Sequence, residues 1–260
     1  MTTPKILALD FDGVICDTLH EVLRSAWQVY REVWNASGDH PPPEAAVAFA
    51  TVRPVLEIGW EAPVLLRAIM EGVPEAAVLE EFQTTWRQRI VEEHHLSPAD
   101  LTARFDAVRD NWIRTDLAGW LGCQEFYPGI AARLRTILRS KIQFFVITTK
   151  GGPYAHLLLE RNGVSLPVAH VWGKECARPK PELLQALFRE MELGDIWFVE
   201  DRLKTLRTVE QQKDLDSVRL FLATWGYNTP AERGEVRVDK RIVPLTLDQF
   251  CSDFSAWTRS

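Results

Sequence analysis

The chain has 260 residues, and its 30 Lys and Arg against 36 Asp and Glu leave a formal net charge of −6 and a pI near 5.6. This acidic balance excludes a basic nucleic-acid-binding protein as the default interpretation. With 46% hydrophobic and 25% charged residues, the composition also excludes a chain that is disordered throughout. The longest apolar run, residues 142–149, has the length of a strand rather than the roughly 20 residues of a membrane span, so a transmembrane protein is excluded.

The N-terminus and the cysteines both indicate an intracellular protein. Met-Thr-Thr-Pro-Lys passes directly into the apolar residues 6–9, without the basic region, long apolar region and cleavage site of a signal peptide, so we expect a cytoplasmic location. The cysteines are scattered, with no C-x-x-C pair and no His at metal-finger spacing. We therefore expect reduced, mostly buried thiols rather than a zinc site or a disulfide framework.

The first 122 residues predict one strand and then a helical segment. Residues 5–9 form a short apolar run that ends in Asp10-Phe11-Asp12-Gly13, as a buried parallel strand does. Apolar residues at three- and four-residue spacing predict an amphipathic helix from 18 to about 35, which Ser37-Gly38 and three prolines end. Further helical patterns cover 44–51, 62–71, 74–95 and 98–118, and no strand-like alternation interrupts them.

From residue 126 onward the pattern alternates between helices and strands. It predicts helices over 130–140, 153–162, 181–192 and 203–213, and strands over 141–149, 169–172, 195–199 and 218–224. Such alternation is typical of a parallel sheet covered by helices on both faces. The tail adds a polar, charged stretch at 232–241, a late strand or edge segment at 242–247 and a final short helix. The first strand therefore belongs to this sheet, and the helical segment is inserted into it.

Polar side chains follow several of the expected strands, at the edge where open parallel sheets bind ligands. The sets are Asp10, Asp12 and Asp17; Thr148-Thr149-Lys150; Glu200-Asp201; and Arg178 with Lys180 in a proline-rich turn that begins a helix. Carboxylates from two strands suit Mg²⁺, which prefers hard oxygen ligands. A hydroxyl group and a fixed cation suit a phosphate group.

In this order, Asp10-Phe11-Asp12-Gly13-Val14-Ile15-Cys16-Asp17, Thr148, Lys180 and Glu200-Asp201 resemble the four motifs of the haloacid dehalogenase (HAD) superfamily. The resemblance covers nearly the whole chain and is nearest to the phosphoglycolate phosphatase and beta-phosphoglucomutase-like branch. It implies an α/β fold: a Rossmann-like three-layer core with a parallel sheet, formed by 1–17 and 126–260, and an inserted all-helical cap domain at 18–125. Four elements in order are far more specific than one D-x-D-G after a strand.

The resemblance also implies roles for the acidic residues. Asp10 would be the nucleophile that forms an aspartyl phosphate. Asp12 would protonate the leaving oxygen and later deprotonate the attacking water. Asp10, the main-chain carbonyl of Asp12, and Asp201 would bind Mg²⁺, with Glu200 in the outer shell of the metal. Taken singly, the Glu200-Asp201 pair is equally well explained as a helix N-cap.

The same resemblance assigns Thr148 as a phosphate donor and Lys180 as the group that neutralises the nucleophile and the phosphoryl oxygens. The turn Arg178-Pro179-Lys180-Pro181-Glu182 fits the family pattern in two registers. We favour Lys180 because an ammonium suits a point-charge role better than a guanidinium, and Arg178 becomes a candidate for substrate binding. Thr149, where many relatives have Asn, is a second candidate for substrate binding. Thr205 stands where many relatives have a second acid.

The choice of substrate is expected to depend on the helical cap. Residues 53–61 place charged and aromatic groups at a break between helices, so Arg53 and Glu57 are candidates for substrate binding. A solvated helix end with a packed Trp explains the same segment. The adjacent His94 and His95 point about 100° apart on a helix, so we interpret them as helix-end surface groups rather than a metal pair.

The leading hypothesis is a Mg²⁺-dependent phosphatase of a small phosphorylated metabolite, of the phosphoglycolate or sugar phosphate type. Asp12 argues against a dehalogenase, which needs no leaving-group acid at this position. One alternative is a phosphomutase of the beta-phosphoglucomutase type, which shares the catalytic residues and differs in cap closure. Another is a binding or assembly protein with little turnover, although close carboxylates without a metal destabilise a fold. No nucleic acid or membrane partner is expected, and the oligomeric state stays open.

Overall fold

The computed structural model describes residues 3–191 and 195–257, and its residue contacts divide the chain into two units. The core unit comprises Met1–Asp17 and Phe126–Ser260, and the helical unit comprises Thr18–Glu125. The chain leaves the core unit after strand β2 (Cys16–Asp17) and returns through β3 (Glu125–Phe126), and these two strands pair with each other. The sequence analysis expects neither strand, because two residues are too few to show a periodic pattern.

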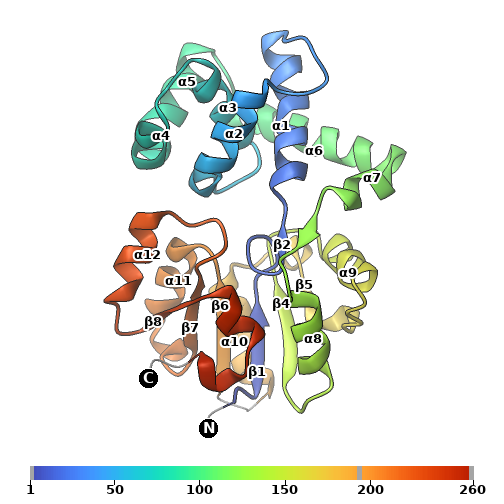
Figure 1. The fold of residues 1–260 in the computed structure, drawn as a ribbon, viewed down its shortest axis with the longest axis vertical. Coiled ribbons are helices and arrows are strands. Elements are labelled where there is room, and N and C mark those ends of the chain that lie inside the picture. The colour runs from blue at the N-terminus through green and yellow to red at the C-terminus, as the bar shows by residue number, and fades with distance from the viewer. Residues whose placement is uncertain (1–2, 192–194, 258–260) are drawn as a thin grey trace. The chain divides into compact units, whose positions relative to one another are not determined.

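Across the described residues, six parallel strands form the central sheet of the core unit in the order β5-β4-β1-β6-β7-β8 (Figure 1). The strands are β1 (Ile6–Leu9), β4 (Gln143–Ile147), β5 (Val171–Trp172), β6 (Ile196–Glu200), β7 (Arg219–Ala223) and β8 (Ile242–Leu245). The order changes direction between β1 and β6, which is where ligands bind in such sheets. Leu9 pairs with Val199, so Asp10 and Glu200 reach the same edge of the sheet together.

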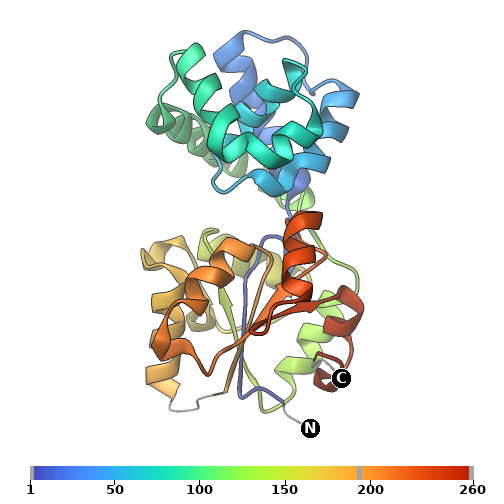
Figure 2. The same ribbon diagram turned by 90° about the vertical axis from the view of Figure 1, so that its left-hand side faces the viewer.

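Helices cover both faces of this sheet (Figure 2). They are α8 (Ile130–Leu138), α9 (Gly152–Arg161), α10 (Lys180–Met191), α11 (Leu203–Glu210), α12 (Pro230–Arg237) and α13 (Leu247–Cys251). Ile6 and Phe198 pack with α10, α11 and α12 on one face. On the other face Trp197 contacts the rings of Phe221 and Trp257. Burial on both faces explains why β1 is an unbroken apolar run, and it confirms the predicted three-layer α/β fold with inserted helices.

The helical unit contains α1 (Leu19–Trp34), α2 (Pro43–Val52), α3 (Glu61–Met70), α4 (Glu75–Glu81), α5 (Arg87–Glu93), α6 (Pro98–Thr115) and α7 (Leu117–Gly122). Its apolar core includes Trp27, Phe49, Leu65 and Phe105. The expected helix over 74–95 is divided by a π-helix at Phe82–Trp86. The expected helix over 98–118 ends at Thr115, because the Asp116 side chain accepts the amide of Gly119 and begins α7.

Helix α12 is the largest element that the sequence analysis does not expect. The Thr229 side chain accepts the amide of Glu232, and the Glu232 side chain accepts the amide of Thr229. This capping box, with Pro230 at the first helical position, is the sequence signal for α12. Only Val236 of α12 is buried, so the helix has almost no apolar pattern. Glu192, the last residue of another expected helix, lies outside the described residues.

None of the helices in 3–191 and 195–257 combines the length and apolar character that crossing a membrane requires. The four cysteines, Cys16, Cys123, Cys176 and Cys251, are free thiols.

Candidate active site

Three buried carboxylates meet where β1 and β6 end. Asp10 follows β1, Glu200 ends β6, and Asp201 follows it. One oxygen from each lies within 4.8 Å of the other two. The parallel pairing of β1 with β6 explains this meeting of residues that are about 190 positions apart in sequence.

Lys180, the first residue of α10, holds two of these carboxylates. Its Nζ lies 2.9 Å from Asp10 Oδ2 and 2.6 Å from Glu200 Oε2. Burial alone would lower the pKa of Lys180, but the charges of Asp10 and Glu200 hold that pKa above its ordinary value. Arg178 is exposed and forms no ion pair with any described residue. Of the two basic residues in the turn, the structure places Lys180 beside Asp10.

The cluster carries more negative charge than one lysine balances. Burial, together with the charge of Glu200, raises the pKa of Asp10 to about 7, although Lys180 opposes the shift. Burial and the charge of Asp10 raise the pKa of Asp201 to about 6. Burial also raises the pKa of Glu200. A further cation would therefore stabilise the ionised carboxylates.

The hydrogen bonds of Asp10 and Glu200 use all four of their carboxylate oxygens. Asp10 Oδ1 accepts the amide of Phe11 at 2.7 Å, and Oδ2 faces Lys180. Glu200 Oε1 accepts the amide of Arg202 at 3.0 Å, and Oε2 accepts Lys180. Glu200 thus holds Lys180 through one oxygen and the Arg202 amide through the other, and its expected place in the outer shell of the metal stays a prediction.

Asp201 differs, because one of its oxygens lacks a partner. Oδ2 accepts the amide of Tyr227 at 2.7 Å, whereas the buried Oδ1 has no hydrogen-bond partner among the described residues. A buried acceptor without a donor is unfavourable. An anionic oxygen in this position is the kind of ligand that Mg²⁺ prefers. The residues present therefore fit a divalent cation next to Asp201 Oδ1 and Asp10.

Two glycines, Gly13 and Gly226, lie so close to Asp201 that neither position has room for a side chain. A Cβ atom on Gly13 would lie 2.0 Å from Asp201 Oδ2, and one on Gly226 would lie 2.4 Å from Asp201 Cβ. Gly13 also has φ of +83°, a conformation that favours glycine. Both positions thus require glycine.

Asp12 and Lys150 form an ion pair at the same edge. Lys150 Nζ lies 3.3 Å from Asp12 Oδ1, and the Lys150 side chain is only 8% exposed. The backbone amide of Lys150 donates to Thr148 Oγ1 at 3.1 Å. The sequence analysis notes Lys150 after its strand but gives it no role. The sequence signal that could have identified Lys150 is its position as the one basic residue directly after Thr148 and Thr149 at the end of a strand.

Thr148 is buried at the end of β4, the neighbour of β1, whereas Thr149 is exposed. Arg53 and Glu57 belong to the helical unit, where Glu57 donates its amide to Glu61 Oε2 at 2.7 Å. Their expected contact with substrate stays a prediction.

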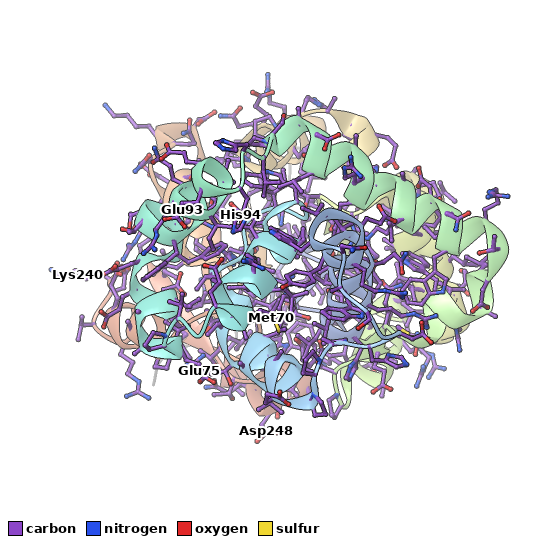
Figure 3. All side chains as sticks on the ribbon, turned by 90° about the horizontal axis from the view of Figure 1, so that it is seen from above. Met70, Glu75, Glu93, His94, Lys240 and Asp248 are labelled. Carbon is purple, nitrogen blue, oxygen red and sulfur yellow. The ribbon has the colours of Figure 1, made fainter. Side chains whose placement is uncertain are left out.

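The two adjacent histidines lie at the end of α5. His94 follows Glu93, the last residue of this helix (Figure 3), and its Nε2 lies 3.1 Å from Glu71 Oε1. His95 has φ of +51°. The two residues therefore lie at the end of a helix, as the sequence predicts.

Comparisons with known proteins add a family and a fold. A family model described as haloacid dehalogenase-like hydrolase matches residues 4–210. A predicted phosphatase from Clostridium acetobutylicum has a similar structure with a TM-score of 0.59 at 12% identity, covering 96% of this chain and 97% of that chain. A predicted phosphoglycolate phosphatase from Haemophilus somnus gives 0.54 at 15% identity, covering 88% of each chain. No curated protein matches this chain.

A further structure of similar fold is a hydrolase of the haloacid dehalogenase-like family from Streptococcus pneumoniae. Its TM-score is 0.54 at 14% identity, with 93% of this chain and 94% of that chain covered.

Proposed function

The chain belongs to the haloacid dehalogenase-like hydrolases, and from this premise we propose that it is a Mg²⁺-dependent phosphatase of a small phosphorylated metabolite. The observation that carries the proposal is the Lys180 ammonium between Asp10 and Glu200, beside the unpartnered Oδ1 of Asp201. Phosphoryl transfer depends mainly on positioning and on charge stabilisation, and this set of groups supplies both.

In the first proposed step, a carboxylate oxygen of Asp10 attacks the phosphorus of the bound ester. The bond from phosphorus to the ester oxygen breaks, and that oxygen takes the proton of the Asp12 carboxyl group, which releases the alcohol. The Phe11 amide and Lys180 hold the two Asp10 oxygens, so the nucleophile is oriented before the substrate binds.

In the second step, a water oxygen attacks the phosphorus of the aspartyl phosphate. The Asp12 carboxylate takes a proton from this water, the bond from phosphorus to Asp10 breaks, and inorganic phosphate leaves. Asp10 and Asp12 thereby return to their starting states.

Three further groups offset the negative charge of the phosphoryl oxygens. Lys180 supplies a fixed charge, and the Thr148 hydroxyl donates a hydrogen bond. Mg²⁺, held by Asp10, the Asp12 carbonyl and Asp201, supplies a second fixed positive charge when it is bound. Glu200 keeps Lys180 in position.

The substrate is proposed to be a phosphoglycolate or sugar phosphate type of ester, in the cytoplasm. Thr149, Arg178, Arg53 and Glu57 are the residues proposed to contact the part of the substrate beyond the phosphate. One of the similar structures is titled a predicted phosphoglycolate phosphatase, and this supports including that ester among the first compounds tested.

The test is phosphate release from a panel of small phosphate esters, with and without Mg²⁺. Asp10→Asn removes the nucleophile with little change in shape, so kcat should fall by roughly 10³-fold or more. Asp106→Asn makes the same chemical change on the exposed surface of α6 and should leave kcat unchanged.

Turnover that requires both Mg²⁺ and Asp10 supports a phosphatase and ranks its substrates. Mg²⁺ binding without release of phosphate from any ester contradicts the phosphatase and favours the phosphomutase. Absence of both Mg²⁺ binding and turnover contradicts catalysis at this site and favours the binding protein.

A further inference from the structure

The loop that follows β7, residues 225–228, donates three hydrogen bonds to Asp201 and to the turn after Asp12. Trp225 Nε1 donates to the carbonyl of Val14 at 3.1 Å, the Tyr227 amide donates to Asp201 Oδ2 at 2.7 Å, and Asn228 Nδ2 donates to the carbonyl of Asp201 at 3.1 Å. This loop lies beyond residues 4–210, the part of the chain that the family model matches. The match to the family therefore says nothing about the role of this loop, and that role has to be inferred from the contacts of its residues.

The amide and the hydroxyl group of Tyr227 bind different parts of the core unit. Its amide holds Asp201, and its hydroxyl donates to Asp17 Oδ1 at 2.7 Å. Asp17 is the residue at which the chain leaves the core unit. One residue, through its backbone amide and its side chain, thus connects the proposed cation ligand with the end of β2.

Tyr227 also lies next to the segment through which the chain returns to the core unit. Tyr127 follows β3, and its amide donates to the carbonyl of Ile15 at 3.1 Å. Burial raises the pKa of the Tyr127 hydroxyl above its ordinary value, and the neighbouring Tyr227, Asp17 and Asp201 raise it further. The residue where the chain leaves the core unit, Asp17, and the residue that follows its return, Tyr127, therefore both lie near Tyr227 and Asp201.

The loop is anchored behind Tyr227 as well. Asn228 is 2% exposed, and its Nδ2 also donates to the carbonyl of Ala223 at 2.8 Å. Arg233 NH1 donates to the carbonyl of Asn228 at 2.6 Å. The C-terminal side of the loop is fixed in this way and Trp225 holds its N-terminal side, while the Tyr227 hydroxyl binds Asp17 between them.

We propose that Tyr227 is a positioning residue for the cation site: its amide orients Asp201 so that Oδ1 faces the cation, and the bond from its hydroxyl to Asp17 keeps that amide in place. The proposal rests on the proposed function, because the cation belongs to it. Groups that orient a metal ligand commonly change metal affinity by 10- to 100-fold when they are removed. A backbone amide is not removed by substitution, but the anchor that positions it can be.

The test is a calorimetric titration of the full chain with Mg²⁺ alone. Tyr227→Phe removes the hydroxyl and keeps the ring and the amide, and we expect the Kd for Mg²⁺ to rise by roughly 10-fold. Asp17→Ala removes the same bond from its other end and should also raise the Kd. The double variant should bind Mg²⁺ no more weakly than Tyr227→Phe alone, because the bond between Tyr227 and Asp17 is already broken in that single variant. Asp17→Asn keeps an acceptor oxygen and should recover most of the affinity.

Tyr30→Phe is the matched control, since the Tyr30 hydroxyl accepts a hydrogen bond from Arg67 at 3.5 Å within the helical unit. Its Kd for Mg²⁺ should equal that of the wild type. Phosphate release adds a second measurement: kcat of Tyr227→Phe should return to within about twofold of the wild type at saturating Mg²⁺, because only the occupancy of the site is reduced.

A wild-type Kd in both Tyr227→Phe and Asp17→Ala overturns this proposal and leaves the proposed function intact. Additive losses in the double variant overturn it too, because the two groups would then act separately. Absence of Mg²⁺ binding in the wild type overturns both proposals.

Discussion

Both units bury carboxylates completely: Glu21 and Glu61 in the helical unit, and Glu200 in the core unit, all with 0% exposure. In the helical unit each carboxylate is surrounded by donors. Glu21 accepts Arg109 Nε at 2.6 Å and Arg109 NH2 at 2.7 Å, with Ser25 and Trp120 donating to the same carboxylate. These bonds join α1 to α6 and α7.

Glu61 shows the same pattern at the start of α3. Its Oε2 accepts the amides of Glu57 and Ile58 and the Gln83 amide group, and its Oε1 accepts Arg87 at 2.6 Å. Gln83 lies in the π-helix. The carboxylate therefore fixes residues 57–58 against the segment that includes α5.

In the core unit, by contrast, one lysine contacts two acids of a cluster of three, and one buried oxygen of the third, Asp201, has no partner in the described part of the chain. A buried charge with all its hydrogen bonds made holds a fold together, whereas a buried charge that lacks partners needs a ligand. Complete burial is common to Glu21, Glu61 and Glu200, and the acid that differs is Asp201, whose Oδ1 has no donor among the described residues.

The largest expected effect is on activity in the core unit. Lys180→Met removes the cation shared by Asp10 and Glu200, so kcat for phosphate release should fall by roughly 10²–10³-fold. Lys213→Met, at an exposed position, is the control and should retain full activity. Activity above a tenth of the wild type in Lys180→Met would show that the lysine is not needed at Asp10.

The helical unit should respond in stability. Arg109→Met leaves the charge of Glu21 buried without its partner, which should lower the free energy of unfolding by about 3–5 kcal/mol in urea denaturation. Adding Glu21→Gln to Arg109→Met removes that charge and should recover part of the loss. A double variant less stable than Arg109→Met would contradict the account of Glu21 as a saturated structural acid.

Asp201→Asn should act in the opposite direction to Arg109→Met. It removes one negative charge from the buried cluster, so the metal-free protein should become more stable by about 1 kcal/mol. The rise in Tm on addition of Mg²⁺, expected for the wild type, should disappear in this variant. Thermal melts with EDTA and with Mg²⁺ measure both effects, and a variant that loses stability and still responds to Mg²⁺ refutes the assignment of Asp201.

The smallest expected effect is on the stability of the core unit, at Asp239. Both oxygens of this acid accept hydrogen bonds, and it lies outside the candidate site. Burial raises the pKa of Asp239, but the amides of Ile242 and Arg241 and the Arg207 guanidinium outweigh burial and hold that pKa below its usual range. The stability from the ionised form is therefore complete above about pH 4 and is lost as the pH falls through the folded pKa.

Asp239→Asn should consequently cost about 1 kcal/mol of unfolding free energy at pH 7 and progressively less below pH 4. Urea denaturation of both proteins at pH 7 and at pH 3 gives the comparison. An equal difference at the two pH values would exclude an ionised Asp239 as its source.

The fold could be predicted from sequence because each central strand carries two separate signals. Residues 6–9 are apolar on both faces, and a polar group follows at once in Asp10. Helix α12 has almost no apolar pattern, and β2 and β3 are too short to show one. Periodicity also misses a buried acid: Glu21 lies on the buried side of α1 with Val22 and Ser25. The spacing of apolar residues predicts only apolar side chains on that side.

The candidate site was only partly open to prediction. Its acids follow strands, and sequence position shows that. Lys150 meets Asp12 across 138 positions, and the Tyr227 hydroxyl meets Asp17 across 210. No spacing rule connects residues so far apart, because their meeting depends on the order of strands in the sheet. The choice between Arg178 and Lys180 likewise needed the first turn of α10.

The position of β1 in the sheet has a consequence for biosynthesis. Its neighbours are β4 and β6, both encoded after the whole helical unit, so β1 emerges from the ribosome more than a hundred residues before either partner. Domains generally fold as units in the order of their synthesis, and non-local pairing is slow. The helical unit is continuous in sequence, so all of its residues are synthesised before either partner of β1. Asp10 and Asp12 are therefore translated long before Lys180 and Asp201, the residues that come to lie beside them.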